Sequence, residues 1–111
     1  MSKIKVILAE SSDVMVYGLT HLLFEQPEIE IVGKATRYNH LCQLIEDVPH
    51  HIVIIGPLMI EKYSHQIVDY ILNRFPEINL IELDDKDNKA TIIQKIQSSY
   101  KRIIDLEVEG L

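Results

Sequence analysis

Four short runs of mainly β-branched apolar residues recur along the chain, and each of the first three is followed by a stretch with helical spacing. The runs cover 3–9, 28–35, 51–56 and 78–83, and the helical stretches cover 13–26, 37–48 and 60–75. This alternation is typical of a parallel sheet covered by helices. Since the runs at 3–9 and 51–56 are mainly apolar, they suit central strands, whereas the run at 28–35 alternates and suits an edge.

Right-handed crossovers between parallel strands leave few topologies for this order of elements. The best match is a flavodoxin-like, three-layer α/β/α sandwich whose parallel sheet has four or five strands. In such a sheet the ligand crevice lies at the carboxyl ends of the first and third strands. The run at 51–56 ends at Gly56, so the place where a reactive side chain is expected offers none.

Length and composition restrict the class of protein further. The 111 residues support a single domain spanning 1–111. The net charge of −6 argues against direct nucleic-acid binding by this segment, which would need lysine and arginine to meet phosphates. The single cysteine, Cys42, cannot form an internal disulfide. No apolar run is long enough for a signal peptide or a membrane span, and we expect a cytoplasmic protein without membrane contact.

The C-terminal stretch has two interpretations. Apolar residues with helical spacing predict one long helix over about 88–106, whereas a shorter helix followed by a fifth strand over "KRIIDLEV" is the alternative. Periodicity favours the long helix. In either case the C-terminal part of the fold is truncated or rearranged.

Two longer segments resemble a known family. "FEQPEIEIVGKA" (24–35) looks like the junction between the first helix and second strand of bacterial response-regulator receiver domains of the NarL/FixJ type. "RFPEINLIEL" (74–83) looks like the entry into their fourth strand. The resemblance covers about residues 3–84 and implies the CheY-like version of the flavodoxin-like fold. It also implies a role in signal transduction or transcription regulation.

The resemblance fails at the residues that carry the family's chemistry. The acidic pair that holds Mg²⁺ aligns with Glu10 and Ser11, so one acid is lost. The phosphoacceptor aspartate aligns with Gly56, and the switch Ser/Thr aligns with Asp84. An aspartyl phosphate needs a carboxylate nucleophile, and a phosphoryl group beside Asp84 would be repelled. The chain therefore resembles a degenerate pseudo-receiver. We expect it to act through protein–protein contacts without phosphorylation, and we expect no enzyme activity, cofactor or metal.

An alternative function uses the acidic residues of the crevice. Glu10, Asp13, Asp84 and Asp85 follow the first and fourth strands, and together they would suit a small-molecule or metal-binding module. The opposing interpretation is that Asp13 caps a helix while Asp84 and Asp85 form a solvated turn.

The C-terminal apolar stripe is a candidate interface. Ile92, Ile96, Tyr100 and Ile103 either pack on the chain's own sheet or pair with another chain. Because a missing β/α unit would leave sheet or helix surface uncovered, we expect a homodimer through this stripe, with another signalling protein as a further partner. By the resemblance, such receivers precede a helix-turn-helix domain. The segment is expected to be a stand-alone protein or the N-terminal part of a LuxR/NarL-type regulator.

Overall fold

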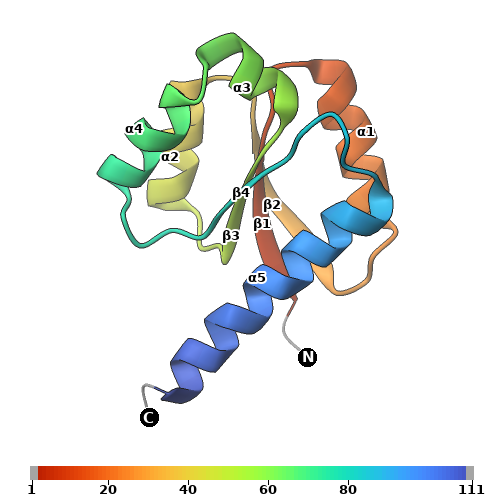
Figure 1. The fold of residues 1–111 in the computed structure, drawn as a ribbon, viewed down its shortest axis with the longest axis vertical. Coiled ribbons are helices and arrows are strands. Elements are labelled where there is room, and N and C mark those ends of the chain that lie inside the picture. Colours follow the sequence, from red (N-terminus) through yellow and green to blue (C-terminus); the bar gives the residue numbers. More distant parts are fainter. Residues whose placement is uncertain (1–2, 110–111) are drawn as a thin grey trace.

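A computed structural model describes residues 3–109, with the side chains of residues 3–107. The elements in chain order are β1 (Ile4–Ala9), α1 (Asp13–Phe24), β2 (Ile29–Ala35), α2 (Tyr38–Asp47), β3 (Ile52–Ile55), α3 (Pro57–Tyr63), α4 (Gln66–Arg74), β4 (Leu80–Glu82) and α5 (Lys89–Glu109). The four strands form one parallel sheet in the order β2-β1-β3-β4. Helices α2 and α4 cover one face, and α1 and α5 cover the other (Figure 1). The predicted flavodoxin-like sandwich is confirmed.

The core consists of two apolar clusters, one on each face of the sheet. Alternate residues of β1 and β3 contribute to opposite clusters, as the two-residue period of a strand requires. Leu8 and Ile54 pack with α1 and α5, whereas Ile7 and Ile55 pack with the helices of the other face. All four are fully buried. The prediction that these two strands are central is confirmed.

The segment predicted as one helix over 60–75 contains two helices. They are separated at Ser64, whose φ of 63° and ψ of 175° are incompatible with a continuing helix. The Gln66 N–H donates to the Ser64 hydroxyl oxygen at 3.2 Å, which supports the new start. Met59 before the break and Ile67 after it belong to the same apolar cluster. Periodicity alone therefore could not reveal the break.

The C-terminal stretch forms the single helix α5, and no fifth strand is present in the described residues. The sheet ends at β4, and α5 returns over the face that α1 also covers (Figure 1). The Lys95 ammonium donates to the backbone oxygen of Glu82 in β4 at 3.2 Å. None of the described helices is both long and apolar enough to cross a membrane.

Candidate functional site

The candidate site lies where the carboxyl ends of β1 and β3 meet. The Gly56 N–H donates to the Ala9 oxygen at 2.8 Å, and the Glu10 N–H donates to the Ala35 oxygen at 3.0 Å. These backbone bonds hold Glu10 and Gly56 beside each other although they are far apart in the sequence. The structure thus brings together Glu10, Ser11 and Gly56, three of the residues that the sequence singled out.

The Glu10 side chain is fully buried and turns towards the start of α3. One carboxylate oxygen accepts the Ser11 N–H at 2.8 Å, and the other accepts the Leu58 N–H at 3.3 Å. Leu58 lies in the first turn of α3, and the residue at the cap position of that helix is Gly56, which has no side chain. The first backbone N–H groups of a helix need acceptors from outside it, and Glu10, directly after β1, provides the oxygen that the cap residue lacks.

The same carboxylate occupies the space that a side chain at position 56 would need. A Cβ atom built on Gly56 would lie 1.6 Å from Glu10 Oε2 and 2.5 Å from its Cδ, far inside contact distance. In this packing the inward conformation of Glu10 therefore requires glycine at position 56, since any larger residue would displace the end of the Glu10 side chain.

Burial of the Glu10 carboxyl raises its pKa above the ordinary value, although the backbone N–H groups of Ser11, Leu58, Met59 and Ser12 oppose the shift. Among the described residues Glu10 forms no ion pair. The charged form is thus stabilised by backbone dipoles alone, which offset only part of the cost of desolvation.

The side chains of Glu10 and Ser11 do not fit the Mg²⁺ site that the family resemblance implies. Mg²⁺ usually takes one or two carboxylates together with phosphate oxygens and waters. Both oxygens of Glu10 accept backbone N–H groups, and Ser11 provides no carboxylate. The Ser11 hydroxyl oxygen is buried without a hydrogen-bond partner in the part of the chain that is described.

The residue that caps the start of α1 differs from the one expected. The N-terminal cap is Ser12, whose hydroxyl oxygen accepts the Met15 N–H at 3.3 Å. Asp13 is the first helical residue, so the prediction that Asp13 caps this helix was wrong by one position. Its carboxylate is nevertheless favourable there, because the first turn of a helix attracts negative charge.

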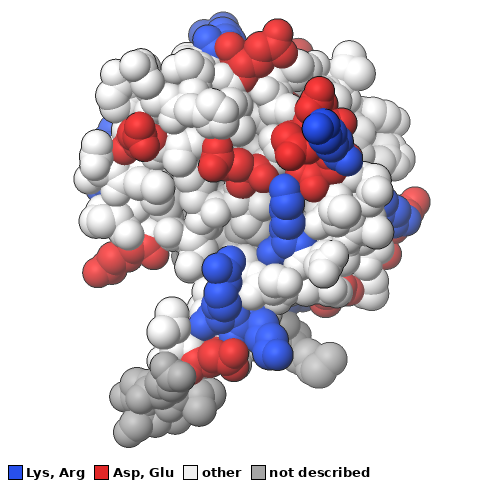
Figure 2. Space-filling model, in the orientation of Figure 1, with Lys and Arg blue, Asp and Glu red and all other residues white. Residues whose placement is uncertain are grey.

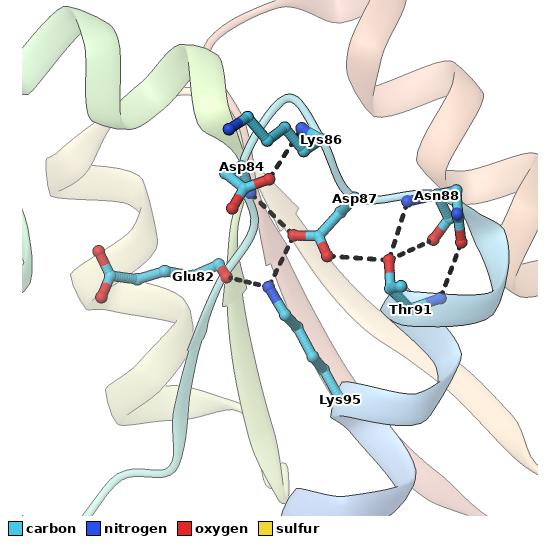
Figure 3. Close-up of polar contacts among 7 residues, drawn as sticks. All are labelled: Glu82, Asp84, Lys86, Asp87, Asn88, Thr91 and Lys95. Atoms are coloured by element: carbon cyan, nitrogen blue, oxygen red, sulfur yellow. Dashed lines mark hydrogen bonds and ion pairs between the residues drawn. The ribbon is translucent and has the colours of Figure 1, made fainter.

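Asp84, the residue aligned with the switch position, belongs to a hydrogen-bonded loop between β4 and α5 (Figure 3). Its N–H donates to Asp87 Oδ2 at 2.9 Å, and its carboxylate accepts the Lys86 N–H at 2.8 Å. Asp84 is exposed, in agreement with the solvated-turn interpretation. It shares no hydrogen bond with Glu10 or Gly56 among the described residues.

Asp87 organises this loop and was not singled out in the sequence. Its carboxylate pairs with Lys95 at 2.7 Å and accepts the Thr91 hydroxyl at 2.9 Å (Figure 3). Burial alone would raise the pKa of Asp87, but the hydrogen bonds from Lys95, the Asp84 N–H and Thr91 outweigh it and lower that pKa. The reciprocal bonds between Asn88 and Thr91 have the three-residue spacing of a capping box, which could have indicated the start of α5.

The four acidic residues of the alternative function differ in their surroundings. Glu10 is buried, whereas Asp13, Asp84 and Asp85 are exposed. Within residues 3–107, no group of three or more His, Cys, Asp or Glu side chains is placed to hold a metal ion.

The candidate interface residues lie mainly inside the domain. Ile92 and Ile96 are 5% and 0% exposed and belong to the apolar cluster with β1 and α1. Tyr100 and Ile103 are partly buried against the same cluster. With α5 packed in this way, Ile92 and Ile96 are core residues that a second chain cannot reach, because the stripe covers the sheet face that we expected to be bare.

Comparison with known proteins gives relatives of one kind. No family model matches the chain. The chain is 27% identical over 109 residues to the uncharacterized transcriptional regulatory protein YhcZ of Bacillus subtilis, covering 96% of this chain and 51% of that protein. It is 24% identical over 114 residues to the transcriptional regulatory protein RcsB of Escherichia coli, covering all of this chain and 49% of that protein. The chain thus spans about half the length of these curated relatives.

Solved structures share the fold. The non-phosphorylated receiver domain of RcsB from Escherichia coli superposes with a TM-score of 0.66 at 23% identity, covering 96% of this chain and 77% of that one. An RcsB response regulator from Salmonella typhimurium gives a TM-score of 0.67 at 24% identity, covering 89% of this chain and 47% of that one.

The chain has the fold of response-regulator receiver domains and is similar in sequence to transcriptional regulatory proteins. Within that class, it is similar to the receiver domains of transcriptional regulatory proteins such as YhcZ and RcsB.

Proposed function

We propose that this chain is a pseudo-receiver, a receiver domain that works in transcription regulation through protein–protein contacts and without phosphorylation or catalysis. The observation that carries the proposal is the pairing of Gly56 with the buried Glu10 carboxylate. The position expected to carry the phosphoacceptor has no nucleophile, and its side-chain space is filled by the buried Glu10 carboxyl group.

The surroundings of this pair support the same function. The first N–H groups of α3, which would suit a bound anion, are already directed at Glu10. A phosphoryl group entering here would meet a buried carboxylate at close range, and two anions in one site disfavour each other.

The direct test is intact-mass spectrometry after incubation with acetyl phosphate and Mg²⁺. We expect an unmodified chain, and we expect Gly56→Asp alone to remain unmodified because Ser11 still replaces a metal-binding acid. An RcsB receiver domain treated in parallel controls for the phosphodonor. Stoichiometric addition of one phosphoryl group to the wild type would refute the pseudo-receiver.

We further propose that the domain forms a homodimer through the distal part of α5. This helix runs beyond the body of the domain (Figure 1). Ile104 and Leu106 are 41% and 67% exposed there, unlike Ile92 and Ile96. Symmetric pairing of such helix ends would bury them, and two-fold dimers are the commonest oligomers. Some RcsB structures contain dimers on DNA, which is a property of that protein.

Sedimentation equilibrium separates the outcomes for the dimer. We expect the wild type to sediment as a dimer and Ile104→Lys/Leu106→Lys to sediment as a folded monomer. Val14→Lys, which changes an 81% exposed residue on α1, is the matched control and should leave the mass unchanged. The measurement is made at tens of micromolar, roughly the concentration at which transient contacts persist. A wild-type mass near 12.8 kDa, the mass of one chain, would refute the dimer.

A further inference from the structure

A groove runs between α1, α3 and the β4–α5 loop, and the residues of the Glu10–Gly56 pair do not line it. Its volume is about 910 Å³. We call it the α1–α3 groove. Its floor is apolar and includes Met15 and Leu22 of α1 and Leu58 of α3. Leu58 is 37% exposed, so the floor is open to a partner.

Acidic side chains border this floor. Glu61 of α3 and Asp84 and Asp85 of the β4–α5 loop line the groove, and all three are exposed. Figure 2 shows acidic side chains around this loop with a basic side chain among them, and further lysine and arginine side chains along α5 below it.

Two of the lysines near the rim pair with other carboxylates, whereas Lys86 lies in the same loop beside Asp84 (Figure 3). Lys89 pairs with Glu25 of α1, and Lys95 pairs with Asp87. Within the described part of the chain, no lysine, arginine or histidine forms an ion pair with Glu61, Asp84 or Asp85.

We infer that the α1–α3 groove is a docking surface for a basic amphipathic helix of a partner protein. An apolar floor with a charged rim matches a helix whose apolar residues recur at i, i+3/i+4 and i+7 and whose other positions are basic. A second copy of this chain is a poorer occupant, because its net charge of −6 would meet an acidic rim. The inference rests on the proposed function in taking the domain to act through protein contact.

The probe is a fluorescein-labelled designed peptide of leucine and lysine, with the leucines on one helical face. Fluorescence anisotropy should show saturable 1:1 binding that weakens as salt rises. A peptide of the same composition with the leucines scattered around the helix, and one with glutamate in place of lysine, should bind at least about tenfold more weakly.

Two matched pairs of variants locate the site. Glu61→Lys/Asp85→Lys should weaken binding at least about tenfold, whereas Asp47→Lys/Glu77→Lys, with the same change in net charge on exposed positions elsewhere, should stay within about twofold. Leu58→Ser should weaken binding, and Leu72→Ser, at an equally exposed leucine of α4, should not. Because all these positions are exposed, the variants should fold, which circular dichroism checks.

Equal weakening by both members of a pair would overturn the inference in favour of non-specific attraction, as would equal binding of the scattered-leucine peptide. An absence of binding by the facial peptide would also overturn it. Neither result affects the phosphodonor experiment, so failure of the groove and failure of the pseudo-receiver are distinguishable.

Discussion

Two carboxylates organise the carboxyl edge of the sheet in opposite ways. Glu10 is buried among backbone N–H groups without a cation, and its pKa is raised. Asp87, whose side chain is 8% exposed, is paired with Lys95, and its pKa is lowered. The contrast shows that burial alone does not fix the charge state of a carboxyl group, because the partners decide whether its charged form gains or loses stability.

The two residues also differ in how far their contacts reach. Glu10 bonds to Leu58, 48 positions along the chain, whereas Asp87 contacts residues between Asp84 and Lys95. A change at Glu10 therefore affects the packing of β3 and α3, while a change at Asp87 should affect mainly the β4–α5 loop.

Gly56→Asp should have the largest effect. The new Cβ would displace the Glu10 carboxylate from its N–H donors and place a second acid beside it. We expect a loss of about 2–4 kcal/mol in the free energy of unfolding. Urea denaturation measures it.

Gly18→Ala is the matched control for a glycine substitution. No atom lies within 4 Å of the Cβ that this change adds in α1, so it should stabilise the domain by up to about 1 kcal/mol. A destabilising Gly18→Ala, or a neutral Gly56→Asp, would contradict the described packing.

Lys95→Met should have a smaller effect. It removes the cation of Asp87 and the donor to the Glu82 oxygen while keeping much of the aliphatic stem. Because Lys95 is partly exposed, we expect a loss of about 0.5–1 kcal/mol by urea denaturation. Lys101→Met, on the same helix and without an ion pair in the described structure, should be neutral. Equal losses of stability in both variants would mean that the effect comes from changing a lysine of α5 and not from the Lys95–Asp87 ion pair.

The pH dependence of stability should have opposite signs at the two carboxyl groups. With its folded pKa raised, Glu10 contributes stability that is fully present below its ordinary pKa of 4.5 and is lost as pH rises through the folded value. With its folded pKa lowered, Asp87 contributes stability that is present above its ordinary pKa of 3.8 and is lost as pH falls through the folded value.

Urea denaturation across this pH range, on Glu10→Gln and Asp87→Asn, separates the two contributions. Relative to wild type, Glu10→Gln should lose the decline on the alkaline side, and Asp87→Asn should lose the decline on the acidic side. The same change in both variants would mean that the two environments do not differ as described.

Much of the fold could be predicted from the sequence, because it depends on patterns that neighbouring residues share. The β-branched runs located all four strands and placed β1 and β3 at the centre, and isoleucine spacing indicated α5. The break at Ser64 could not be predicted in this way, since Met59 and Ile67 keep one apolar face across it.

Some residues of the site could be predicted, but their geometry could not. The family resemblance pointed to Glu10, Ser11 and Gly56, which do lie together. The capping contact of Glu10 with Leu58 depends on the packing of β1 against β3 and α3, which no local pattern records. We expected Ile92 and Ile96 at an interface, and they pack inside the domain. Periodicity shows that a stripe is buried but does not show which surface buries it.

The central claim is that Gly56 and Glu10 form one unit, and a double-mutant cycle with Gly56→Ala and Glu10→Ala measures it most directly. In the presence of Glu10, the added methyl group should cost about 2–3 kcal/mol in urea denaturation, since it would displace the carboxylate from its N–H donors. In the Glu10→Ala background the cost should fall to about 1 kcal/mol or less, the usual penalty for alanine at a cap position. A coupling energy of at least about 1 kcal/mol is the predicted result, and equal costs of Gly56→Ala in both backgrounds would contradict the account.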